Sequence, residues 1–162
     1  MSGIYFDESI ISVDLEATSS EDVLRSMGRN LYDKNLVKET FTQAIIDRED
    51  EFATGLPTSG VSVAIPHTDT EHVNAKTISV ATLKEPVDFG VMGGGPDETT
   101  PVKVVFLLAM NDSSHQLSLL QQLMQVFQDE KTLMTLANEK DASHIKRILI
   151  EKLSLDFKGG EA

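Results

Sequence analysis

An almost entirely apolar run, Val102–Met110, constrains the fold of this chain more than any other segment. A strand with one solvated face alternates apolar and polar residues, so a continuous apolar run predicts a strand covered on both faces. Helical patterns stand before and after this run. The chain is therefore predicted to be an α/β protein with a single sheet and helices on both faces. Because helices and strands do not alternate strictly, we expect the sheet to be mixed.

Five helices are expected. The first begins at Ser19–Ser20, where hydroxyl side chains and two acidic residues form a helix start. The apolar spacing of the next segment predicts a helix over about 39–52. A third helix is expected near His115, with Asn111, Asp112, Ser113 and Ser114 as its capping residues and Ser113 or Ser114 as the cap itself. Two shorter helices are expected over about 130–137 and 142–153. The expected inward faces are Val23, Leu24, Met27 and Leu31 in the first helix, Phe41, Ala44, Ile45 and Phe52 in the second, and Leu117, Leu120, Met124 and Phe127 in the third.

Strands are expected over 61–65, 77–83 and 102–110, with a short extended piece at 87–89. The glycines of the 93–96 segment predict a turn. The first dozen residues and the tail from residue 158 onward are expected to be loose. At 162 residues the chain is predicted to form one domain, residues 1–162.

Composition excludes several classes of function. A net charge of −12 disfavours nucleic acid and anionic membranes as partners, whereas an acidic face can receive a basic protein. The simpler reading of this charge is solubility. The absence of cysteine excludes disulfides and thiolate chemistry and fits a cytoplasmic protein. With no apolar run near about 18 residues and no visible signal peptide, we expect no insertion into a membrane.

His67 is the first candidate site residue because it follows Pro66 at the end of the predicted 61–65 strand. Proline lacks an N–H group and has a fixed φ angle, so it should end the strand and turn the chain. A loop at a strand end is where a rigid fold presents a reactive group. An imidazole there can act as a nucleophile near neutral pH. The alternative is a histidine that merely covers the end of the strand.

Two further residues complete the predicted site. His115 lies at a helix N-terminus that follows another strand, and such N-termini bind phosphate through free N–H groups. Arg48 can hold phosphate oxygens through its planar guanidinium group. Together these residues predict reversible phosphoryl transfer. The alternatives are that His115 is a plain surface residue and that Arg48 pairs with Asp47 or Glu51.

Other chemistries fit the sequence less well. The Gly93–Gly95 run lacks the Lys-Ser/Thr of a phosphate-binding loop. The acidic and histidine residues of the 67–72 segment match no metal-ligand spacing, so neither a metal nor a cofactor is expected. The serines lack the surroundings of a hydrolase nucleophile. His72 and His144 are expected to be exposed and structural.

Several motifs recur in one known family: Arg48-Glu49, Thr54-Gly55-Leu56, Val63-Ala64-Ile65-Pro66-His67, Val102-x-Val104-Val105-Phe106-Leu107-Leu108-Ala109 and His115-x-x-x-Leu119-Leu120. In combination they resemble the enzyme IIA component of the bacterial phosphoenolpyruvate:sugar phosphotransferase system. The resemblance is to the fructose/mannitol superfamily, which includes galactitol-type and nitrogen-regulatory members. It covers about residues 18–153. Within it, Phe52-x-Thr54-Gly55 and His72-Val73-x-Ala75-Lys76 look most like the galactitol-type branch.

The resemblance implies a mannitol-type enzyme IIA fold and a free-standing phosphocarrier. It implies that His67 accepts a phosphoryl group from HPr and passes it to a cysteine of enzyme IIB, in support of galactitol-like or fructose-like sugar uptake. His115 would be the auxiliary histidine and Arg48 the residue that stabilises the phosphoryl group. Asp69 is expected either to point away from that group or to orient the ring. The alternative is a nitrogen-regulatory protein in which phosphorylation of His67 selects regulatory partners.

Overall fold

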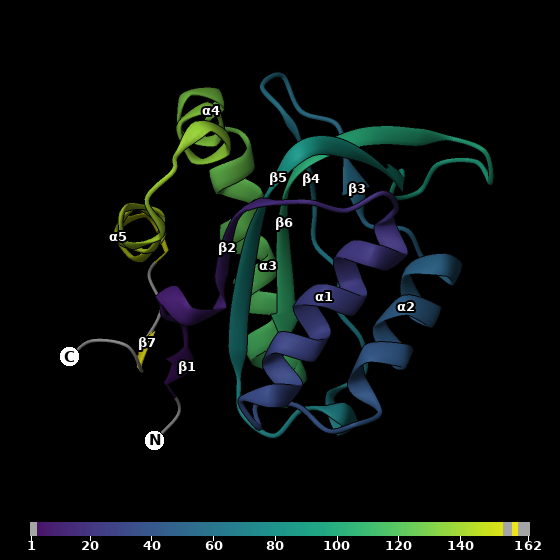
Figure 1. Cartoon of the computed structure of the whole chain (residues 1–162), viewed down its shortest axis with the longest axis vertical. Helices are drawn as coiled ribbons and strands as arrows, with labels where there is room; N and C mark the ends of the chain where they lie inside the picture. Colours follow the sequence, from purple (N-terminus) through teal and green to yellow (C-terminus); the bar gives the residue numbers. More distant parts are fainter. Residues whose placement is uncertain (1–2, 154–156, 159–162) are drawn as a thin grey trace.

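A seven-stranded mixed sheet forms the centre of the computed structural model, which describes residues 3–153 and 157–158 (Figure 1). The strand order is β3-β4-β6-β5-β1-β7, and β2 also pairs with β5. The strands are β1 (Ile4–Tyr5), β2 (Ile11–Leu15), β3 (Gly55–Leu56), β4 (Ser62–Ala64), β5 (Thr77–Gly90), β6 (Thr99–Ala109) and β7 (Phe157–Lys158).

The long strands β5 and β6 form an antiparallel hairpin that organises the sheet. Their pairing runs from Thr77 opposite Ala109 to Gly90 opposite Thr99, with an irregularity between Thr82 and Val87. Strand β4 joins the other edge of β6 in parallel. Because β4 and β6 are parallel, their C-terminal ends lie at the same edge of the sheet. That edge is where ligand sites form in layered α/β folds.

Helices cover both faces of the sheet, as predicted (Figure 1). One face packs against α1 (Ser20–Asp33) and α2 (Phe41–Glu51), and the other against α3 (Ser113–Phe127), α4 (Glu130–Asn138) and α5 (Ala142–Lys152). Short 3-10 turns lie at Glu8–Ile10 and Thr70–His72. Strand β6 supplies both cores: Val104, Phe106 and Leu108 face α3–α5, whereas Val105, Leu107 and Ala109 face α1 and α2. This alternation explains why its sequence is apolar throughout.

The predicted helix starts are confirmed in place, with one correction to a cap. Ser19 caps α1 by accepting the N–H of Asp22. Helix α3 begins at Ser113 and is capped by Asp112, one of the four expected capping residues, and not by Ser113 or Ser114. A carboxylate in that position also complements the positive end of the helix dipole. Within the described residues, no helix combines the length and apolar character needed to cross a bilayer.

The expectation of a loose N-terminus is wrong. Ile4, Phe6, Ile10 and Ile11 are buried, and β1 and β2 add to the sheet beside β5. The alternation of Ile11, Val13 and Leu15 with polar residues was the available signal. The predicted 77–83 strand and 87–89 piece are one continuous strand, β5. Of the tail that was expected to be loose, residue 158 belongs to β7 and residues 159–162 lie outside the described part.

Two predicted helix faces also need correction. In α3 the buried residues are Leu119, Leu123, Val126 and Phe127, whereas Leu117 and Met124 are exposed. Two stripes of this helix satisfy helical spacing, so periodicity alone could not select the inward one. In α2, Phe41 and Ile45 are buried as predicted, but Phe52 follows the end of the helix and is 55% exposed.

Candidate functional site

The segment after β4 fixes His67 beside the end of β6. Strand β4 ends at Ala64, two residues before Pro66, yet the carbonyl oxygen of Pro66 accepts the N–H of Leu108 at 3.0 Å. His67 then forms an isolated parallel bridge with Leu108. Proline removes a donor but keeps its acceptor, so the segment stays attached to the sheet. His67 therefore lies at a defined position on the C-terminal edge.

The His67 ring is held by a main-chain hydrogen bond. Its Nδ1 lies 2.8 Å from the carbonyl oxygen of Ile65. A carbonyl can only accept, so Nδ1 must donate, and in the neutral ring the lone pair is on Nε2. Burial lowers the pKa of His67, as does the nearby charge of Arg48, although the Ile65 carbonyl acts in the opposite direction. The arrangement favours a neutral imidazole with Nε2 as its nucleophilic atom.

Arg48 lies in the last turn of α2 and faces the segment that carries His67. Its NH1 atom is 3.7 Å from Oδ1 of Asp69. Its Cζ atom is 4.8 Å from the centre of the Phe52 ring, a cation–π arrangement. The structure thus pairs Arg48 with Asp69 rather than with the helical neighbours considered from sequence. It also places Arg48 near enough to His67 for the guanidinium charge to lower the pKa of the ring.

Glu49 is a buried carboxylate that the sequence analysis missed. It is only 8% exposed, and its two oxygens accept the N–H and the hydroxyl of Thr54, each at 2.8 Å. Burial raises the pKa of Glu49, while the bonds from Thr54 act to lower it. The signal was the four-residue step from Phe41 to Ile45 to Glu49, which places Glu49 on the buried face of α2. The pair fixes the chain just after Arg48.

His115 lies in the first turn of α3, at the same end of the sheet. Asp112 accepts the N–H groups of Ser114 at 2.8 Å and His115 at 3.4 Å. Nδ1 of His115 is 3.1 Å from Oδ2 of Asp112 but makes no well-aligned hydrogen bond. Contacts with Ser114 and His115 hold the pKa of Asp112 far below its usual range. Since β6 runs into this helix just after Leu108, the topology places both histidines at one edge.

The remaining histidines have structural partners. His72 is mostly buried, contrary to expectation, and its Nδ1 lies 2.8 Å from the Thr40 hydroxyl. His144 is half-exposed, and its Nδ1 lies 2.5 Å from a Glu139 oxygen. Among the described residues, no group of three or more His, Cys, Asp or Glu is arranged to hold a metal ion.

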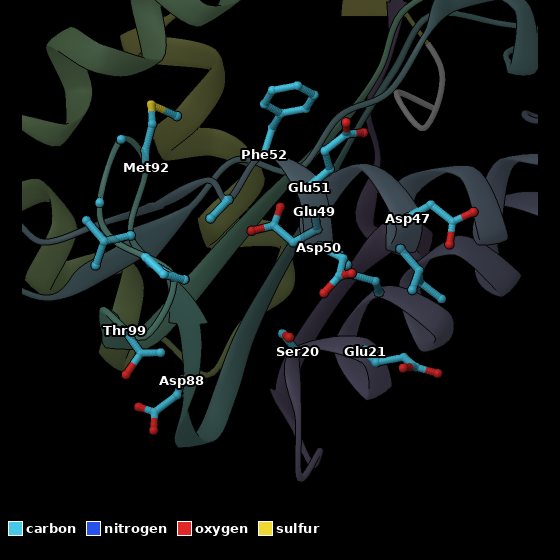
Figure 2. A pocket seen from close by; sticks show the side chains of 18 of the residues that line it. Ser20, Glu21, Asp47, Glu49, Asp50, Glu51, Phe52, Asp88, Met92 and Thr99 are labelled. Carbon is cyan, nitrogen blue, oxygen red and sulfur yellow. The ribbon is translucent and has the colours of Figure 1, made fainter.

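A large acidic cavity of about 810 Å³ lies between α1, α2 and the β5–β6 hairpin, next to the end of α2 (Figure 2). Carboxylates from all three elements surround it: Glu21, Asp47, Glu49, Asp50, Glu51 and Asp88. Neither His67, Arg48 nor His115 lines it. An acidic lining repels phosphate, so this cavity is a poor candidate for phosphoryl chemistry. The edge that holds His67 and Arg48 is the candidate site.

Comparison with known proteins identifies the family to which the chain is similar. Residues 4–152 match the family model described as "Phosphoenolpyruvate-dependent sugar phosphotransferase system, EIIA 2". The galactitol-specific EIIA component of Escherichia coli K12 is 28% identical over 133 residues, covering 80% of this chain and 87% of that protein. The mannitol-specific enzyme IIA component of Staphylococcus aureus is 27% identical over 154 residues, covering 93% of this chain and 98% of the relative.

Solved structures show the same fold. A IIA protein from Streptococcus mutans, PtxA, superposes with a TM-score of 0.75 at 23% identity, covering 90% of each chain. Mannitol enzyme IIA of Escherichia coli, solved in complex with phosphorylated enzyme IIB, gives 0.72 at 24% identity over 90% of this chain and 99% of that one. The nitrogen regulatory protein IIA-Ntr of Neisseria meningitidis gives 0.71 at 25% identity over 89% and 95%. The predicted mannitol-type fold is thereby confirmed.

Proposed function

Because the chain belongs to the EIIA 2 family of the phosphoenolpyruvate-dependent sugar phosphotransferase system, whose members are phosphotransferases, we propose that His67 is its phosphoryl acceptor. The donor is phospho-HPr, and the acceptor of the next step is a cysteine of a sugar-specific enzyme IIB. The observation that carries this proposal is the His67 ring, with Nδ1 bonded to Ile65 and Arg48 nearby. The protein acts in the cytoplasm, where phosphoenolpyruvate supplies the phosphoryl group.

In the proposed transfer, the Nε2 lone pair of His67 attacks phosphorus while the bond from phosphorus to the donor nitrogen breaks. The donor ring recovers its lone pair, and the His67 ring becomes positively charged with its Nδ1 proton in place. The Ile65 carbonyl oxygen stabilises that charge. The transition state is loose, so positioning and electrostatic stabilisation by Arg48 and the start of α3 supply the acceleration.

The test is a labelling reaction with phosphoenolpyruvate, enzyme I and HPr. The protein should acquire a phosphate that is labile in acid and stable in alkali. His67→Ala should abolish the label, and His144→Ala, which changes a histidine paired with Glu139, should label normally. Normal labelling of His67→Ala would contradict the proposal.

The galactitol-specific relative and the galactitol-type motifs support a galactitol-like sugar as the transported cargo, with a fructose-like sugar as the alternative from sequence. A second candidate function follows from the likeness to the nitrogen regulatory protein. In that role, phosphorylation of His67 would change which regulatory protein is bound. Incubation of the phosphorylated protein with candidate enzyme IIB domains separates the two roles: transfer to a cysteine supports transport, and phosphate-dependent binding without transfer supports regulation.

A further inference from the structure

The side chains of His67 and Asp69 leave the same side of the segment after β4. Thr68 between them is buried at 7% exposure, whereas Asp69 is exposed. In extended chain, side chains two residues apart point the same way. Arg48 faces both of them, since it lies 3.7 Å from the Asp69 carboxylate and its charge lowers the pKa of His67.

The Arg48 guanidinium group therefore interacts electrostatically with both Asp69 and His67. The face of Arg48 stacks on Phe52, which leaves its N–H edge available for an anion. The separation of 3.7 Å from Asp69 exceeds a hydrogen-bond length, so this carboxylate is held by charge attraction alone. A phosphoryl group on His67 would bring stronger acceptor oxygens to the same edge.

We propose that Asp69 occupies the phosphoryl group's place on Arg48 while His67 is unphosphorylated, and is displaced when the phosphoryl group arrives. This inference rests on the proposed function. Before transfer, Asp69 neutralises Arg48. After transfer, one guanidinium faces two anions, and Asp69, with a side chain 73% exposed, turns to water. Asp69 thus raises the free energy of the phosphorylated protein and keeps its phosphoryl group easy to pass on.

The test compares Asp69→Asn with Glu71→Gln, a matched loss of charge on the same segment whose carboxylate lies near His72 instead. With HPr and a limiting phosphoryl supply, Asp69→Asn should shift the transfer equilibrium toward the phosphorylated protein by about 2- to 5-fold, the effect of a partly screened charge pair. It should prolong the lifetime of the phosphohistidine by a similar factor. Glu71→Gln should match the wild type.

A second readout needs no phosphorylation and separates this inference from the proposed function. Without Asp69, Arg48 is uncompensated, so the His67 ring should protonate at lower pH in an NMR titration. This shift should be smaller when Arg48→Gln is the background, because no guanidinium then holds Asp69 on the side of His67. An unchanged ring pKa in Asp69→Asn, or an equal shift in Glu71→Gln, would overturn the inference. If the wild type titrates as expected but accepts no phosphate, the proposed function fails instead.

Discussion

His67 combines a fixed tautomer with a lowered pKa, and each property comes from its surroundings. The Ile65 carbonyl fixes the proton on Nδ1, and burial together with Arg48 disfavours the charged ring. The neutral ring is the nucleophilic form, so His67 keeps this form at pH values where a free histidine would be protonated.

The first prediction concerns pH. The pKa of His67, followed by NMR titration, should lie below the ordinary histidine value of about 6.5, and Arg48→Gln should raise it. Because folding lowers this pKa, the unfolded chain binds the proton more readily, and stability is lost as pH falls below about 6.5. His67→Gln should reduce that loss in urea unfolding at pH 5 relative to pH 8. A midpoint above 6.5 would contradict the argument.

The second prediction concerns Arg48. Its guanidinium can give charge-assisted hydrogen bonds of about 1.5–3 kcal/mol each to phosphoryl oxygens. Arg48→Ala should therefore slow labelling by about 10- to 100-fold without unfolding the protein. Arg25→Ala, which removes an exposed arginine paired with Glu21 on α1, should label at the normal rate. Equal labelling rates for the two variants would show that Arg48 is only a surface ion-pair residue.

At the scale of elements, the end of α2 is anchored from inside. The third prediction is that Glu49→Ala destabilises the protein by about 3 kcal/mol, because two buried donors of Thr54 lose their partner. Thr54→Ser, which keeps both donors, should cost less than Thr54→Val in the same urea-unfolding experiment. Similar stability of the Ser and Val variants would show that the hydroxyl bond contributes little.

The fourth prediction concerns the start of α3. His115→Ala should still accept phosphate on His67, with transfer slowed by about 10- to 100-fold, most strongly toward enzyme IIB. Asp112→Ala should fray the first turn and slow transfer as well, whereas Asp112→Asn, a good cap, should restore it. Mass spectrometry of alkaline digests locates the phosphate. Phosphate found only on the peptide that contains His115 would make His115 the phosphoryl acceptor and His67 the auxiliary histidine.

The sequence predicted the elements with strong periodicity or caps, and their placement around one mixed sheet. The Ser19 cap at the start of α1 and the apolar run of β6 are local patterns, and each predicted its element correctly. It missed β1, β2 and β3, which are short and gain their stability from pairing. The His67 and Arg48 positions were predicted, but not the Asp69 contact or the burial of Glu49. The Asp69 contact and the burial of Glu49 depend on which loop packs against α2, and the local sequence pattern does not specify this packing.

At the scale of the whole molecule, charge is unevenly distributed. The net charge is −12, and carboxylates from α1, α2 and β5 gather around one cavity (Figure 2). Like charges at close range destabilise the folded state unless salt screens them. The cavity therefore lowers stability most at low ionic strength.

The fifth prediction follows from this arrangement. Raising the salt from about 0.01 M, where the Debye length is about 30 Å, to about 0.15 M should raise Tm. Asp50→Lys should raise Tm at low salt and weaken its dependence on salt. Glu151→Lys, which changes net charge equally on exposed surface of α5, should do so less. Calorimetry at both salt concentrations measures this, and equal effects of the two variants would assign the repulsion to net charge rather than to the cavity.

The bridge between His67 and Leu108 also bears on how the protein is made. The ribosome releases α1, α2 and β4 before β6, the strand to which the His67 segment is attached. A nascent chain that ends before β6 holds His67 without the strand that fixes its position. Under the proposed function, we therefore expect phosphoryl acceptance to begin only once β6 has emerged and paired, so that truncated translation products draw no phosphoryl groups away from the finished protein.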